Sequence, residues 1–200
     1  MRIRRFAAPC LFLASLPSGV TAQDHRHIGS TSPYAGWETR AIKSLSNADI
    51  EELRRGGGWG LALAAELNRA PGPAHLLELK GEIGLSADQV AEISAIHATM
   101  KHEAMAVGER FIAVEEAIER AFVRAELDEE QLRFLKEQSA AARAELRFVH
   151  LSRHLLTPPL LTDAQVERYE VLRGYSPDPC ASVPEGHDPA MWRRHNGCDR

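Results

Sequence analysis

The 200-residue sequence lacks the common signatures of hydrolytic enzymes, membrane helices and β-sheets. It has only three cysteines, none of them in a nucleophile motif, and it has no HExxH pair. No stretch approaches the roughly 20 consecutive apolar residues that a membrane helix needs. No segment alternates polar and apolar side chains convincingly, as a half-buried strand does. We therefore expect an all-α protein that is not an enzyme and that inserts no helix into a membrane.

The first 22 residues have the three parts of a secretory signal peptide. Three arginines precede an apolar run at 6–16, and small residues follow up to Ala22. We expect cleavage near Ala22 and a periplasmic protein. Loss of the three arginines would change the formal net charge from 24 − 28 = −4 to 21 − 28 = −7. Such an acidic surface is unsuited to nucleic acid, which we exclude as a partner.

Cleavage also removes Cys10 and leaves Cys180 and Cys198. In an oxidising compartment, an isolated pair of cysteines is more often a disulfide than a set of metal ligands. Closing a loop of this size stabilises a chain by about 3 kcal/mol in the chain-entropy model. The alternative is a zinc site made by both cysteines with His187 and His195, but the spacings match no known zinc finger. We expect the disulfide.

Four segments share a pattern that is typical of helix starts. An apolar residue precedes Ser, Asp or Thr, and Gln or Asp follows three residues later. In a capping box the first polar side chain accepts a hydrogen bond from a backbone N–H three residues on, and the second reaches back. The pattern therefore predicts four helix starts, at LSNADI (45–50), LSADQV (85–90), LDEEQL (127–132) and LTDAQV (161–166).

Two long helices are predicted in the middle of the chain. Apolar side chains recur at alternating spacings of four and three residues from Ile93 to Ala121 and again from Leu132 to Leu156. This spacing is typical of a helix that packs along a neighbour. Pro158-Pro159 ends the second helix. Because only a few residues near 125–128 separate the two segments, we expect a long antiparallel helical hairpin.

Shorter helices and an irregular tail are expected around the hairpin. We expect short helices from Asn47 to about Leu53 and from Asp163 to about Arg173. The glycine run at 56–60 lacks the GK[ST] ending of a phosphate loop and is interpreted as a flexible joint. The tail is rich in Pro, Gly and polar residues. The expected organisation is a signal peptide at 1–22, a short-helix segment at 23–74, the hairpin domain at 75–175 and the tail at 176–200.

An exported helical hairpin with two LTxxQ-type elements, LSADQ at 85–89 and LTDAQ at 161–165, resembles the Spy/CpxP family of periplasmic stress proteins and its heavy-metal-resistance relatives. The resemblance covers roughly residues 75–173. It implies a hook-shaped helical homodimer that works without a required cofactor and without bond-making chemistry. Such proteins act as ATP-independent chaperones that hold unfolded clients, or as metal-responsive sensors or scavengers.

Histidine and methionine spacings invite comparison with the metal-responsive relatives, whose ligands come as His-x3-His and His-x3-Met. HLSRH at 150–154 matches the first spacing and places both imidazoles on one helix face. HATMKHEAM at 97–105 departs from the second, because its His–Met pairs are three residues apart. Copper, nickel or zinc are the expected ions, with copper favoured by the thioethers. The candidate ligands are His150, His154, His97, His102, Met100 and Met105.

In the hairpin we expect these histidines at about the same level along the helix axes, but on different sides of the helices. The series of apolar side chains marks the face on which each long helix packs against the other, and His97 belongs to that series. His102 then lies on the outer side, and His154 lies further out than His150. A single four-histidine site inside one hairpin is therefore not expected, whereas a site shared with a second protomer or with the short flanking helices stays open. The alternative is packing alone, with Met100 in the core and His97 as a hydrogen-bonded core histidine.

The leading functional hypothesis is an exported stress-response protein that binds or senses transition-metal ions. The alternative is a chaperone, for which the second long helix offers basic side chains between apolar ones, such as Arg147 beside Phe148. A third hypothesis is a regulatory protein that binds a membrane sensor and releases it under stress.

Overall fold

The structure is a computed structural model that describes residues 31–198, and a compact unit begins at Gly36. The chain is all-α, as predicted. An isolated bridge joins Ile42 and Leu45, and there is no strand among the described residues. No helix within 31–198 is long and apolar enough to cross a membrane. The predicted signal peptide at 1–22 lies outside the described residues.

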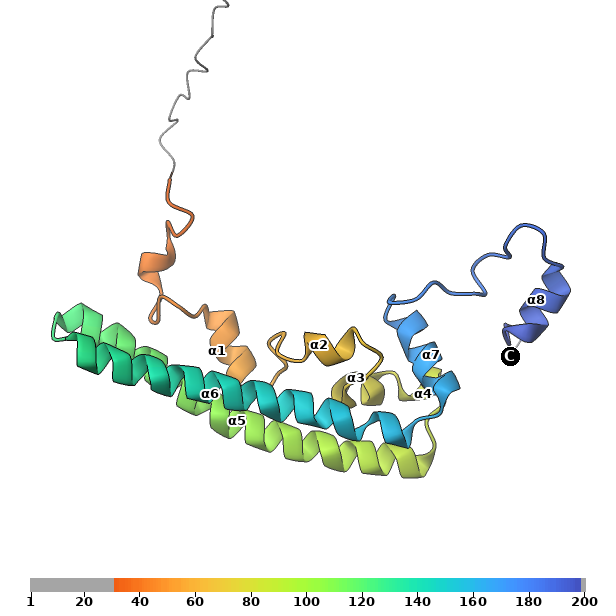
Figure 1. The fold of residues 1–200 in the computed structure, drawn as a ribbon, viewed down its shortest axis with the longest axis horizontal. Coiled ribbons are helices and arrows are strands. Elements are labelled where there is room, and N and C mark those ends of the chain that lie inside the picture. The colour runs from red at the N-terminus through yellow and green to blue at the C-terminus, as the bar shows by residue number, and fades with distance from the viewer. Residues whose placement is uncertain (1–30, 199–200) are drawn as a thin grey trace, which may run out of the picture. The chain divides into compact units, whose positions relative to one another are not determined.

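Two long helices form the predicted hairpin (Figure 1). Helix α5 spans Ala87–Arg124 and α6 spans Glu129–Leu156, and they run side by side. Ala125 ends α5 in the left-handed region, with φ 54°. Asp128 then caps α6, because its side chain accepts a hydrogen bond from the Gln131 backbone N–H at 2.8 Å. The turn therefore lies near 125–128, as predicted.

Shorter elements flank the hairpin, most of them before it in the chain. They are the 3₁₀ turns Trp37–Thr39 (η1) and Pro158–Leu160 (η2) and the helices α1 (Asn47–Arg54), α2 (Leu63–Glu66), α3 (Pro73–Glu78), α4 (Lys80–Ile83), α7 (Asp163–Leu172) and α8 (Pro189–His195). Helices α1 and α3 contact α5, and α2 contacts α6. The segment before the hairpin thus packs along both long helices.

The capping motifs are confirmed, and two of them also contact each other. Ser46, Ser86 and Thr162 each form a reciprocal capping box at the start of α1, α5 and α7. In addition, Gln89 Nε2 donates to the Gln165 side chain at 2.8 Å and to a backbone carbonyl of η2 at 2.6 Å. The two LTxxQ-type elements therefore fix the start of α5 against the start of α7, which capping alone did not predict.

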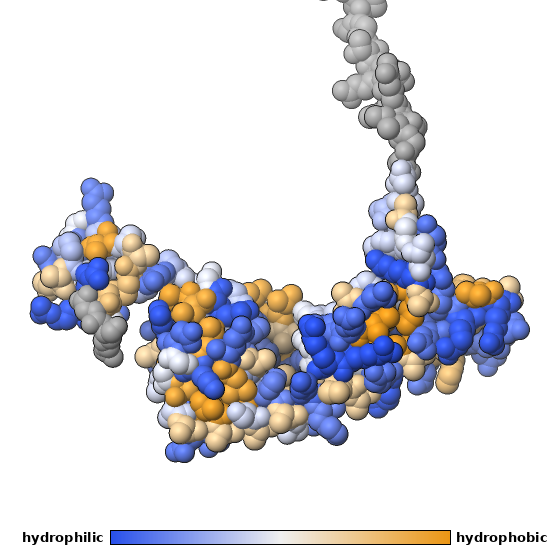
Figure 2. Space-filling view, turned by 180° about the vertical axis from the view of Figure 1, so that it is seen from behind, coloured by the Kyte–Doolittle hydropathy of each residue, from blue (hydrophilic) through white to orange (hydrophobic). Residues whose placement is uncertain are grey.

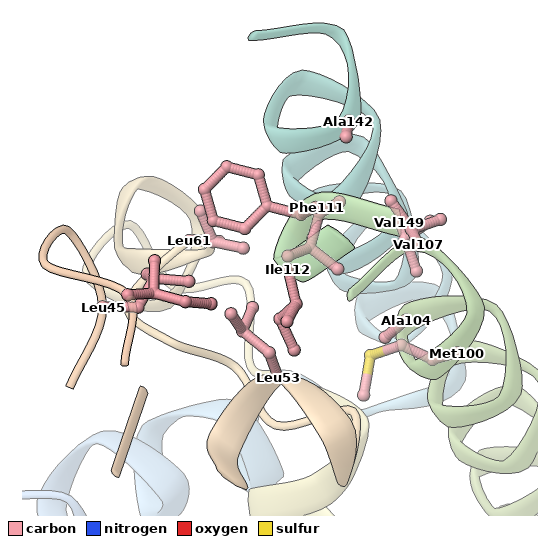
Figure 3. Packing of buried hydrophobic residues seen from close by; sticks show 12 residues of the cluster. Leu45, Leu53, Leu61, Met100, Ala104, Val107, Phe111, Ile112, Ala142 and Val149 are labelled. Atoms are coloured by element: carbon pink, nitrogen blue, oxygen red, sulfur yellow. The ribbon is translucent and has the colours of Figure 1, made fainter. Parts of the chain in front are cut away.

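The main core lies between the hairpin and the segment that precedes it (Figure 3). Leu45, Leu53 and Leu61 reach toward Phe111 and Ile112 of α5, and all five are buried. A second cluster joins α3, α4, α5 and α7 through Leu76, Ile83, Ile93 and Tyr169, respectively. Burial of side chains of this size stabilises a fold by about 1.5–3 kcal/mol each. The short helices are therefore integral to the fold.

Two residues at the ends of α6 were predicted to be buried against the neighbouring helix, and this prediction is wrong. Leu132 is 37% exposed and Leu156 is 51% exposed, although the spacing placed both in the buried seam. Between them Ala142, Leu146 and Val149 are buried as predicted. The spacing identifies the face of the helix correctly, but burial also requires a neighbour at that level. The two end positions lack enough cover.

The tail carries the predicted disulfide and an unpredicted helix. Cys180 and Cys198 are bonded, so their thiolates are not free to form the alternative zinc site. Helix α8 begins after Asp188, whose side chain accepts from the Met191 backbone N–H at 2.8 Å, with Pro189 at the first helical position. This Asp-Pro helix start is a local signal. The description of the tail as irregular was wrong at this helix.

Candidate functional site

A cavity of about 490 Å³ lies between α5, α6 and the segment from α1 to α3. The glycine run at 56–60 forms part of its wall. Four histidines and one buried methionine line it: His75, His97, His150, His154 and Met100. The structure therefore brings four of the six candidate ligands to one cavity and adds His75 from α3. The short flanking helices contribute to this site, an arrangement that the sequence left open.

His150 on α6 is buried and has an unused nitrogen. Its side chain is 2% exposed, and Nε2 has no hydrogen-bond partner. Burial, with the nearby His154, lowers the pKa of His150 to about 4, while a hydrogen bond with the Gly57 backbone acts in the opposite direction. At neutral pH the imidazole is therefore uncharged, the form in which histidine binds metal ions.

His154 lies one helical turn after His150 and is also buried, at 7% exposure. Its Nδ1 lies 2.6 Å from the Ala70 carbonyl oxygen. A carbonyl only accepts, so Nδ1 donates, and in the neutral tautomer Nε2 carries the lone pair. A Cβ on Gly72 would lie 2.5 Å from Nε2, so a larger residue at this position would force the ring to shift. The expected outward position of His154 was wrong, because residues 70–72 cover this face of α6.

The HATMKHEAM stretch divides between the cavity and solvent. Met100 is 6% exposed and His97 is half-buried, and both line the cavity. Burial, and then the charge of Lys101, lower the pKa of His97. His102 is exposed, and Met105 is 41% exposed and does not line the cavity. The structure therefore does not bring His102 and Met105 together with the other candidate ligands.

A buried carboxylate on α2 belongs to the same cavity and was missed from the sequence. Glu66 is 6% exposed, and its Oε1 accepts hydrogen bonds from the hydroxyls of Tyr169 and, at 3.0 Å, Tyr175. His75 Nδ1 and Arg173 Nε lie 3.3 and 3.4 Å from the same oxygen. In contrast, Oε2 has no partner. The one available signal was an acid inside the apolar run LALAAEL.

Glu66 stays ionised despite its burial. Burial alone would raise its pKa, but hydrogen bonds from His75, Tyr169 and Tyr175 outweigh it and lower the pKa to about 2. The same environment raises the pKa of Tyr169, by burial and by the adjacent carboxylate. The cavity therefore holds an ionised carboxylate close to the uncharged imidazole of His150.

The protein groups alone do not form a complete metal site. Within residues 31–198, no group of three or more His, Cys, Asp or Glu side chains is arranged to hold a metal ion. The two α6 imidazoles and the Met100 thioether are the donors that the cavity offers to a soft or borderline ion.

No protein-family model, curated protein or solved structure matches the chain. The resemblance to Spy/CpxP proteins therefore rests on the sequence elements at 85–89 and 161–165 and on the hairpin order.

Proposed function

We propose that this chain is an exported, non-catalytic stress-response protein that binds a transition-metal ion, copper foremost, through His150 and His154. The observation that carries the proposal is the buried Nε2 of His150, which has no partner and lies in an uncharged ring. Leaving a buried polar atom unpaired costs about 1–3 kcal/mol. A metal ion would use this lone pair.

The surroundings of the two imidazoles support this role. His154 donates Nδ1–H to the Ala70 carbonyl, and His150 lines the cavity together with Gly57. Metal-binding histidines typically donate the second ring N–H to a carbonyl or carboxylate, which fixes the tautomer and the orientation of the ring. The His154 ring is thus held by the segment that lies before the hairpin in the chain.

The neighbouring side chains favour copper over harder ions. The Met100 thioether lines the same cavity, and His97 lies three residues before it on α5. Thioethers are soft ligands that suit Cu(I), and imidazole suits copper, nickel and zinc. A hard ion such as Mg²⁺ would instead need several oxygen ligands.

Calorimetric titration of the processed chain tests the proposal. We expect Cu²⁺ to bind with micromolar or better affinity in a non-coordinating buffer, and His150→Gln with His154→Gln to abolish this binding, because both imidazole ligands are then absent. His102→Gln is the matched control, because His102 is exposed and outside the cavity. Equal affinity in the double variant and the unmutated chain would place the ion elsewhere and reject the proposal.

A second candidate function, holding unfolded clients without ATP, is favoured by exposed aromatic side chains. Phe122, Phe134 and Phe148 are 61%, 60% and 68% exposed. Phe134 and Phe148 are two heptads apart and so share one face of α6. Figure 2 shows apolar patches between hydrophilic areas on the face that it draws. Exposed apolar patches are typical of surfaces that bind other proteins.

An aggregation assay with an unfolding client tests this candidate. We expect suppression at near-stoichiometric ratio without ATP, and loss of most of it in Phe134→Ser with Phe148→Ser. Both side chains are exposed, so the substitutions should leave the melting temperature nearly unchanged. No suppression at a several-fold molar excess of the unmutated chain would remove the candidate.

A further inference from the structure

The cavity is much larger than a bare metal ion requires. Its volume is about 490 Å³, whereas one water molecule occupies roughly 30 Å³ in the liquid. Pockets that bind small organic molecules measure about 300–1,000 Å³. Part of the space is therefore available for an organic group that accompanies the ion.

The protein donors are also too few for a divalent copper ion. Cu(II) and Ni(II) prefer square-planar or tetragonal coordination by nitrogen and oxygen. The two α6 imidazoles supply two nitrogens, and the described part of the chain has no third His, Cys, Asp or Glu grouped with them. The Met100 thioether is a weak, axial type of donor for Cu(II). Two equatorial positions would remain for ligands from outside the protein.

The Glu66 side chain determines which chemical groups the additional, non-protein ligand of the metal needs. Its Oε1 accepts hydrogen bonds from two tyrosine hydroxyls, whereas Oε2 is buried and without a partner, although the residue lines the cavity. A buried charged oxygen without a donor is costly. A ligand with N–H groups would satisfy it. Lys101 of α5 also lines the cavity and provides a cation for a carboxylate of that ligand.

We infer that the cavity binds the metal as a one-to-one complex with a small nitrogen–oxygen chelator of the amino-acid class. The inference rests on the proposed metal function and names its ligand. His150 and His154 fill two equatorial positions, and the amine and carboxylate of the chelator fill the other two. The amine N–H groups then donate to Glu66 Oε2. A one-to-one complex of Cu²⁺ with glycinate has a single positive charge, which complements the Glu66 carboxylate.

Binding experiments with matched chelators test this inference. The probes are Cu²⁺ alone, Cu²⁺ with one equivalent of glycine, and Cu²⁺ with one equivalent of N,N-dimethylglycine, which lacks N–H groups. We expect the glycine complex to bind about tenfold more tightly than either other probe, the size of one charge-assisted hydrogen bond. With ¹⁵N-glycine, the electron paramagnetic resonance spectrum of bound copper should change, because the glycine nitrogen stays coordinated.

Protein variants give an independent check. Glu66→Gln should remove the preference for the glycine complex, whereas Glu78→Gln, an exposed residue of α3, makes the same charge change and should keep it. If Glu66→Gln fails to fold, the dimethylglycine comparison on the unmutated chain decides alone. Binding of Cu²⁺ with no preference for glycine, or release of glycine on binding, overturns this inference but leaves the metal function standing. Absence of binding by all three probes overturns both.

Discussion

Gly108→Ala is expected to destabilise the fold by about 1–3 kcal/mol, the usual cost of overpacking a core. Gly108 lies on α5 where α1 crosses it. A Cβ built there would lie 2.7 Å from the Leu53 carbonyl oxygen and 3.2 Å from its carbonyl carbon. These are backbone atoms, so α1 would have to move away from the core that Leu53 helps to fill. Urea unfolding of the two chains measures the difference.

Gly81→Ala is the matched control. Gly81 lies in α4, and nothing lies within 4 Å of a Cβ built there. Alanine should therefore stabilise the chain by about 0.4–1 kcal/mol, because it reduces the conformational freedom of the unfolded state. If Gly108→Ala is as stable as Gly81→Ala, the close packing of α1 on α5 is not a feature of the folded protein.

The helices that were predicted from the sequence are those determined by interactions between residues close together in the chain. The capping residues Ser46, Ser86, Asp128 and Thr162 determine where helices begin, and each acts within three residues of the chain. The hairpin follows because two amphipathic segments are joined by a short turn. In contrast, the hydrogen bond between Gln89 and Gln165 joins residues 76 apart in the sequence, and no local pattern indicates it.

Only part of the candidate site was predicted, because local spacing determines some of its geometry and long-range packing determines the rest. The i,i+4 spacing of His150 and His154 places both on one helix face, which local geometry is enough to show. Their burial depends on residues 57 and 70–72, which come from a segment whose position no periodicity specifies. Glu66 joins this site through Tyr169 and Tyr175, more than 100 residues later. Long-range packing of the short helices therefore decides which of the six candidate ligands meet.

The metal-free chain should lose stability as the pH falls from 6.5 to 4. The pKa of His150 is about 4 in the folded state and about 6.5 in the unfolded chain. Between these values the unfolded state binds more protons, so the free energy of unfolding falls with falling pH. The full loss is about 3 kcal/mol, and the lowered pKa of His97 adds to it in the same direction.

The surroundings of His150 explain why it resists protonation. Burial lowers its pKa most, and His154 and Arg153 on α6 lower it further. Lys101 on α5 lines the same cavity. Urea unfolding with excess EDTA, at several pH values in this window, measures the slope. His150→Gln should remove most of the pH dependence, because no group titrates at that position. His102→Gln should keep it, since His102 is exposed. If the unmutated chain shows no slope, or if both variants flatten it equally, then His150 is not the buried, uncharged imidazole on which the metal site depends.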